Sequence, residues 1–280
     1  MPTFDRIISG GTIVDGKGHA PYSADIGIKD GKISAIGSDL GSAGETVNAD
    51  GLTVTPGWVD IHTHYDAQAT WDPELLQSTL HGVTSAVFGN CGVGFAPAKP
   101  DRHGWLINLM EGVEDIPGVS LHAGLDWKWE SFPDYIDALE RMPRAFDVGT
   151  QMTHGALRTY VMGQRGADNK AATEDDTKRM AELIKEGMAA GALGFTTSRT
   201  EIHIDVDGVP VPGTYAGAEE LIPLANAVRE SGHGLMEMVL AGVGGENCEA
   251  LDREMTLVRK VAEGSNCPVM YLQVQHNADA

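Results

Sequence analysis

The sequence predicts an α/β protein with a parallel sheet or barrel, preceded by a small β domain. Three observations carry this prediction. Residues 1–56 consist of short strands and turns, and apolar strands alternate with amphipathic helices after Pro56. The third is size: 280 residues with 42% hydrophobic content can bury a sizeable core. We therefore expect two parts, residues 1–56 and 57–280.

The first part contains a clear hairpin signal. Alternating apolar residues run over 6–14 and again over 25–37, and Asp30-Gly31 interrupts the second run. An Asp-Gly step between two alternating runs is typical of a two-residue β-turn. This pattern predicts a small β domain.

Six stretches after Pro56 have the length and apolar character of buried strands. They cover residues 58–64, 83–89, 146–152, 193–197, 234–240 and 268–274, and amphipathic helices are expected at 174–190, 216–231 and 247–263. A closed barrel of βα units needs more strands than these. We therefore expect residues 57–280 to hold the first six βα units of a barrel that is incomplete in this chain. Its last strands would be absent or supplied by another chain.

The charge balance favours small-molecule chemistry. The chain has 40 acidic and 20 basic residues, which gives a formal net charge of −20 at pH 7. Such a field repels nucleic acids and anionic membrane surfaces, so neither is an expected partner.

The cysteines and the N-terminus indicate a reducing compartment. Cys91, Cys248 and Cys267 form no regular framework and leave one thiol over, which fits free thiols better than disulfides. Residues 1–6 show no basic segment followed by an apolar core, and no apolar stretch is long enough to span a bilayer. We therefore expect a soluble, cytoplasmic protein.

The strongest chemical signal is a pair of histidines, His62 and His64, at the end of the first strand predicted after Pro56. Alternate side chains of a strand share a face, so the two imidazoles point the same way. Imidazole nitrogen is a common ligand of zinc, and a catalytic zinc needs about three protein ligands with one position open. Two ordinary histidines at a strand end are the alternative interpretation.

A thiol follows the second of these strands. Cys91 lies in Gly89-Asn90-Cys91-Gly92, at the same end of the sheet as the histidine pair. A thiolate there completes a His-His-Cys set for zinc, or bridges two metal ions. A small buried hydrophobic residue is the alternative, because free cysteines are most often of that kind.

Two motifs carry a family resemblance. Asp-Ile-His-Thr-His-Tyr-Asp at 60–66 and Gly-Val-Thr-Ser-Ala-Val-Phe-Gly-Asn-Cys-Gly at 82–92 together resemble the amidohydrolase superfamily, in particular its N-acyl-D-amino-acid deacylase (D-aminoacylase) branch. The segments 8–16 and 56–60 fit the start expected of that superfamily, and the likeness extends from residue 5 to about 275. Its most specific part is Gly-Asn-Cys-Gly.

The resemblance implies a (β/α)8 TIM-type barrel with a β-sandwich to which the N-terminal segment contributes. It also implies a hydrolase in which a metal-activated water cleaves the linear amide of a small N-acyl-(D-)amino acid. His62, His64 and Cys91 carry over as ligands of Zn2+, with one or two ions. The general base, a carboxylate of the last strand, is expected beyond residue 280.

Two positions depart from the family pattern. Where histidines are expected at the ends of the fifth and sixth strands, the chain has Glu237 and Gln273, and His276 lies beyond the expected strand end. A carboxylate binds zinc through oxygen, so Glu237 is the fourth candidate metal ligand. The side-chain amide of Gln273 is a poor substitute for a histidine ligand. The number of metal ions therefore stays open.

Two polar residues after the fourth strand are candidates for substrate binding. Arg199 suits a substrate carboxylate, with a salt bridge inside this acidic protein as the alternative. His203 is a candidate ligand or proton-transfer group, with a solvated loop histidine as the alternative. His154 and Arg158, after the third strand, are further candidates to line the pocket.

Two other functions stay open at this point. A cyclic-amide hydrolase of the hydantoin or dihydropyrimidine type belongs to the same superfamily. A barrel that has lost catalysis would serve as a binding or assembly protein, and the missing histidines favour it. The candidate protein partners are a second copy of the chain, in a homo-oligomer, and the missing C-terminal part of the same protein.

Overall fold

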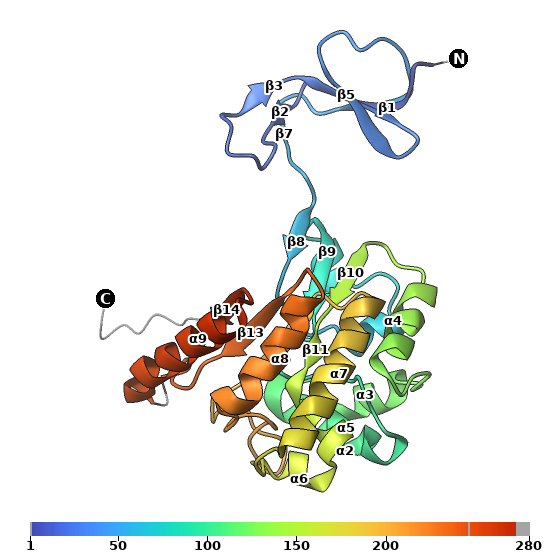
Figure 1. Cartoon of the computed structure of the whole chain (residues 1–280). Helices are drawn as coiled ribbons and strands as arrows, with labels where there is room; N and C mark the ends of the chain where they lie inside the picture. Colours follow the sequence, from blue (N-terminus) through green and yellow to red (C-terminus); the bar gives the residue numbers. More distant parts are fainter. Residues whose placement is uncertain (1, 246, 273–280) are drawn as a thin grey trace. The chain divides into compact units, whose positions relative to one another are not determined.

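The computed structural model describes residues 2–245 and 247–272 (Figure 1). Contacts divide the chain into two units, Met1–Trp58 and Val59–Ala280. In the described part of the chain, no helix is long and apolar enough to cross a membrane.

The first unit contains two small sheets. The four-stranded sheet has the order β5-β4-β1-β6, and the three-stranded sheet has the order β3-β2-β7. Their strands are β1 (Phe4–Ser9), β2 (Thr12–Ile13), β3 (Tyr22–Ser23), β4 (Asp25–Lys29), β5 (Lys32–Gly37), β6 (Ala43–Asn48) and β7 (Thr53–Val54).

The hairpin expected at Asp30-Gly31 joins β4 to β5, which pair antiparallel. Both turn residues have positive φ, 51° for Asp30 and 71° for Gly31. That combination matches the right-handed twist of the two strands, which is why the Asp-Gly step predicts this turn.

The second unit is an α/β structure with parallel strands in chain order (Figure 1). One ladder has the order β10-β9-β8 and the other β11-β12-β13-β14, and a single residue, Gln151, separates β10 from β11. The strands are β8 (Trp58–Asp60), β9 (Val83–Phe88), β10 (Asp147–Thr150), β11 (Met152–Thr153), β12 (Gly194–Ser198), β13 (Leu235–Val239) and β14 (Val269–Leu272). Each predicted stretch therefore contains a strand, and the third is split in two.

The first strand of this unit is shorter than the sequence predicts. It ends at Asp60 rather than at residue 64, because the Asp60 carboxylate accepts the backbone N–H of His62 (3.2 Å) and turns the chain. Thr63 still pairs with the neighbouring strand, since its N–H donates to the carbonyl of Val87 (2.9 Å). The two histidines therefore lie in a loop that stays attached to β9.

Helices follow the strands along the chain. They are α1 (Leu76–Thr79), α2 (His103–Glu114), α3 (Gly118–Gly124), α4 (Phe132–Arg141), α5 (His154–Met162), α6 (Gln164–Ala167), α7 (Glu174–Ala190), α8 (Ala218–Glu230) and α9 (Leu251–Ser265), with short 3-10 turns at Gln68–Thr70, Pro100–Arg102 and Cys248–Ala250. In α7, a capping box of Thr173 and Asp176 starts the helix and Gly191, with φ 116°, ends it.

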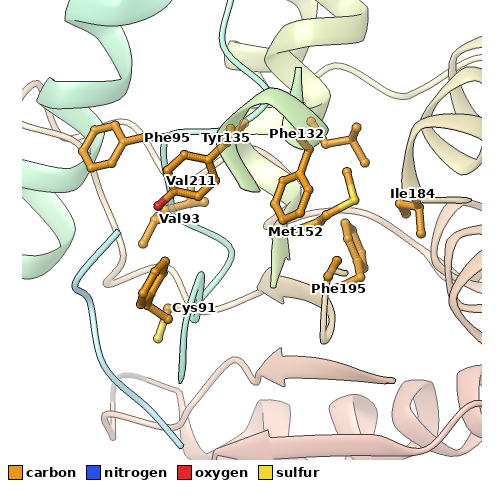
Figure 2. Packing of buried hydrophobic residues seen from close by; sticks show 14 of the residues in the cluster. Cys91, Val93, Phe95, Phe132, Tyr135, Met152, Ile184, Phe195 and Val211 are labelled. Carbon is orange, nitrogen blue, oxygen red and sulfur yellow. The ribbon is translucent and has the colours of Figure 1, made fainter. Parts of the chain in front are cut away.

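One continuous apolar core fills the second unit. Figure 2 shows Phe132, Met152, Ile184 and Phe195 gathered in one group, with Cys91 in the same buried cluster. Met152 of β11 and Phe195 of β12 are paired in register, so side chains of adjacent strands meet there. The core thus extends to the loop that carries the thiol.

Candidate metal centre

Three of the four predicted metal ligands lie together. One ligand atom each of His62, His64 and Cys91 fall within 4.8 Å of one another. Sγ of Cys91 is 3.3 Å from Nε2 of His62, and the two imidazole rings are 5.4 Å apart between centroids. Two imidazole nitrogens and one sulfur form a donor set that zinc uses in proteins.

Local structure places the two histidines on either side of an anchored threonine. The N–H and the hydroxyl of Thr63 both donate to the carbonyl of Val87, each at 2.9 Å. His62 and His64 flank this anchor and are partly buried, with side chains 30% and 16% exposed. The position of the imidazoles thus depends on the pairing with β9.

Cys91 has an unusual backbone conformation. Its φ is 57°, in the left-handed region that residues other than glycine rarely adopt, and its neighbours Gly89 and Gly92 have φ of 77° and 72°. A Cβ on Gly89 would lie 2.3 Å from the carbonyl oxygen of Gln151, and one on Gly92 2.7 Å from the backbone nitrogen of Ser198. Only glycines permit this close approach of the loop.

Hydrogen bonds from the sheet hold that loop. The N–H of Cys91 donates to Oε1 of Glu237 (2.9 Å). The N–H of Gly92 donates to the hydroxyl of Thr196 (3.1 Å), which in turn donates to the carbonyl of Gly89 (2.7 Å). Strands β12 and β13 therefore fix the conformation in which the thiol is presented.

A buried amide pair links the thiol loop to the histidine segment. Nδ2 of Asn90 donates to the carbonyl oxygens of Thr63 (2.9 Å) and Val87 (3.1 Å). Its Oδ1 accepts from Nε2 of Gln151 (2.8 Å), which also lies 3.3 Å from Oε2 of Glu237. Asn90 is 0% and Gln151 3% exposed, so this network is closed to solvent.

Glu237, the fourth predicted ligand, lies behind the cluster. Its side chain is 0% exposed and is not a member of the group of three. Oε2 is 3.9 Å from Nδ1 of His62. Metal ligation by Glu237 stays a prediction. The sixth-strand positions, Gln273 and His276, lie outside the described residues.

Two further carboxylates, at positions for which the sequence predicts no role, lie at this site. Oε1 of Glu114, at the end of α2, is 3.3 Å from Nε2 of His64. Asp66 is 1% exposed, and its Oδ2 is buried without a hydrogen-bond partner in the described part of the chain. Asp66 follows His64 by two residues, which is a usable signal; Glu114 has none.

Burial sets the protonation of these groups. Burial raises the pKa of Glu237 to about 7. Burial together with nearby negative charges raises the pKa of Glu114 to about 7 and that of Asp66 to about 8. Burial and the neighbouring carboxylates also raise the pKa of the Cys91 thiol. Burial, with His62 and His203 nearby, lowers the pKa of His64 to about 3, so its imidazole is neutral.

This arrangement fits a divalent cation. Nδ1 of His64 is buried without a hydrogen-bond partner among the described residues, as a ligand nitrogen reserved for a metal would be. Metal coordination requires neutral imidazoles and a deprotonated thiol, and a bound cation would favour the charged forms of the thiol and of the buried carboxylates. His62, His64 and Cys91 therefore fit a divalent cation such as zinc.

The two predicted substrate-binding residues differ in position. Nε and Nη2 of Arg199 donate to the carboxylate of Glu254 (2.6 and 3.1 Å), and Nη1 donates to the carbonyl of Ala216. This is the salt bridge that the sequence left open as the alternative. His203 lies near the metal cluster, since its charge lowers the pKa of His64, and its Nδ1 is 3.0 Å from Oγ of Ser198. Substrate roles for Arg199 and His203 stay predictions.

His154 and Arg158 form a separate buried network. Nε2 of His154 lies 3.0 Å from Oε1 of Glu220, and Nη1 of Arg158 donates to the same oxygen. Nδ1 of His154 lies 2.8 Å from the Thr197 hydroxyl. Burial pushes the pKa of Glu220 upward, but the His154 and Arg158 contacts outweigh it and lower the pKa to about 2. The two side chains thus tie α5 to α8 and β12.

Comparison with known proteins gives consistent matches. The model of the amidohydrolase family matches residues 45–280. An uncharacterised protein of Mycobacterium tuberculosis (strain ATCC 25618 / H37Rv) is 33% identical over 241 residues, 82% of this chain and 39% of the relative. A D-aminoacylase of Alcaligenes xylosoxydans xylosoxydans is 34% identical over 195 residues, 69% of this chain and 37% of the relative.

A solved structure resembles most of this chain. It is the crystal structure of an N-acyl-D-glutamate deacylase from Bordetella bronchiseptica, complexed with zinc and a phosphonate inhibitor. The TM-score is 0.74 at 28% identity, over 95% of this chain and 50% of that one. The chain thus spans half or less of the length of the proteins it matches.

Proposed function

The chain belongs to the amidohydrolase family, and we propose that it carries the metal-binding part of an N-acyl-D-amino-acid deacylase. The proposed reaction is hydrolysis of the linear amide of a small N-acylated amino acid. The observation that carries this proposal is the convergence of His62, His64 and Cys91 within 4.8 Å. Relatives named D-aminoacylase and N-acyl-D-glutamate deacylase support the substrate class.

We propose that the parallel strands β8 to β14 form the first part of a (β/α)8 TIM-type barrel. Their chain order is that of such a barrel. The remaining strands and the general base would come from sequence beyond this chain, because the matched relatives are twice as long as the matched part or longer. We further propose that the two sheets of the first unit contribute to a β-sandwich.

We propose zinc as the metal, held by His62, His64 and Cys91. A zinc ion bound there would lower the pKa of a coordinated water towards ~7 and polarise the amide carbonyl. The protein's part is to present neutral imidazoles, which burial ensures for His64, and to keep the thiol aimed at them. The strained loop around Cys91 fixes this geometry before any substrate arrives.

The test combines metal analysis with a substrate panel on the protein in its full natural length. We expect a stoichiometric divalent metal, loss of activity with a chelator, and faster hydrolysis of N-acyl-D-amino acids than of N-acyl-L-amino acids or hydantoins. Activity that is indifferent to chelation, in a protein without metal, would refute the proposal. Preference for hydantoins would assign the cyclic-amide alternative, and metal binding without hydrolysis of either class would favour the binding protein.

A further inference from the structure

We infer that Glu237 and Glu114 are positioning residues that orient the two imidazoles of the metal centre, and that neither is a metal ligand. The inference rests on the proposed function, because it takes His62 and His64 as ligands. It gives Glu237 a different role from the one its place in the sequence predicts.

The His62 ring has its two nitrogens in different surroundings. Nε2 is 3.3 Å from Sγ of Cys91, whereas Nδ1 is 3.9 Å from Oε2 of Glu237. One nitrogen therefore faces the thiol and the other faces the carboxylate. A metal-binding histidine usually directs its second N–H at a carboxylate or a carbonyl, which fixes the tautomer and the ring orientation.

His64 shows the same division with a second carboxylate. Its Nε2 is 3.3 Å from Oε1 of Glu114, and its Nδ1 is buried without a partner among the residues that the structure describes. The nitrogen that faces the carboxylate carries the proton, because a neutral imidazole has one donor and one lone pair. Nδ1 then holds the lone pair for the metal.

Both oxygens of Glu237 already have donors. Oε1 accepts the N–H of Cys91 at 2.9 Å, and Oε2 lies 3.3 Å from Nε2 of Gln151. If the carboxylate turned towards the metal, the Cys91 N–H would lose its acceptor at a site where Glu237 is 0% exposed. Water could not replace that bond, and the left-handed conformation of Cys91 would lose its anchor.

Among the residues that the structure describes, the protein donors of the centre are then one sulfur and two nitrogens. A set of three protein ligands with an open position is the arrangement of catalytic zinc sites. We therefore expect this chain to hold one ion with His62, His64 and Cys91.

Glutamate-to-glutamine substitutions test this inference. In the full-length protein, Glu237→Gln and Glu114→Gln keep the side-chain shape but remove the charge that orients each imidazole. We expect each variant to bind one ion per chain with an affinity about 10- to 100-fold lower. With Co2+ as the probe, the thiolate charge-transfer band per bound ion should be unchanged, since Cys91 stays a ligand. The number of donors seen by X-ray absorption with Zn2+ should also be unchanged.

The matched control is Glu220→Gln, a buried glutamate that pairs with Arg158 instead of the metal centre. Its metal affinity should equal that of the unmodified protein. If the unmodified protein binds no stoichiometric ion, the proposed function fails. If it binds one through the thiolate, but Glu237→Gln loses a donor or both variants bind as tightly as the unmodified protein, only the inference is overturned. Should Glu237→Gln not fold, Glu114→Gln decides on the same criteria, because its side chain is 18% exposed.

Discussion

Replacing Asn90 with alanine should destabilise the second unit strongly. Asn90 is 0% exposed and makes three hydrogen bonds through its side chain, to the carbonyls of Thr63 and Val87 and from the amide of Gln151. Alanine removes all three. The thiol loop and the histidine segment then lose the link that the Asn90 amide makes between them.

The expected loss in free energy of unfolding depends on which hydrogen bonds the three partners of Asn90 keep. The Val87 carbonyl still accepts from Thr63, and the Gln151 amide still lies near Glu237, so each of these losses is worth about 1 kcal/mol. The Thr63 carbonyl is left without this acceptor bond in a half-buried position, which costs about 1–2 kcal/mol. We therefore expect the free energy of unfolding to fall by about 3–4 kcal/mol.

The assay is urea unfolding followed by tryptophan fluorescence, with chelator present so that metal affinity does not add to the result. Trp71, Trp105, Trp127 and Trp129 report on the second unit, where they lie. The control is Asn48→Ala in the first unit, which removes one hydrogen bond, to the exposed N–H of Asp50. A decrease below about 1 kcal/mol for Asn90→Ala would refute the reasoning.

Three further predictions concern the loop, the pH dependence and the metal. Gly92→Ala should lower the free energy of unfolding by more than 2 kcal/mol, roughly, and abolish metal binding, because its Cβ would lie 2.7 Å from the Ser198 nitrogen. Gly18→Ala, which also has positive φ (78°) but open space, isolates the backbone strain, and equal losses would contradict the prediction. For Glu220, the folded pKa of about 2 lies below the ordinary value of 4.5, so its stabilisation is present above pH 4.5 and is lost as the pH falls towards 2. Acid titration of stability should therefore lose about 3 kcal/mol over that window, a loss that is absent in Glu220→Gln. Saturating zinc should raise the free energy of unfolding by about 3 kcal/mol at a hundredfold excess over Kd, and a thermal scan that shows no shift would argue against the site.

The sequence predicted the strands and the long helices well because their signals are local. The helix expected at 174–190 is observed as Glu174–Ala190, since a capping box at Thr173 starts it and Gly191 ends it. The strand expected at 58–64 covers only Trp58–Asp60 in the structure. An Asp60 side chain that turns the chain onto itself leaves no trace in an apolar pattern.

The candidate site divides in the same way. His62, His64 and Cys91 could be grouped because they follow neighbouring parallel strands, whose carboxyl ends meet. Glu114 could not be assigned to this group from the sequence, because it lies at the end of helix α2 and not at the end of a strand. Arg199 left two interpretations open, since its partner Glu254 lies 55 residues further along the chain, on α9.

The order of the strands also bears on how the centre is assembled during synthesis. His62 and Cys91 come from the ends of β8 and β9, which are consecutive in the chain, whereas Glu237 is separated from Cys91 by 146 residues. A growing chain that pairs its strands in order therefore has all three donors side by side long before β13 emerges. The nascent protein would hold a metal-competent but loosely oriented cluster first. The contacts of Glu237 with Cys91 and His62 would form in a later step of folding.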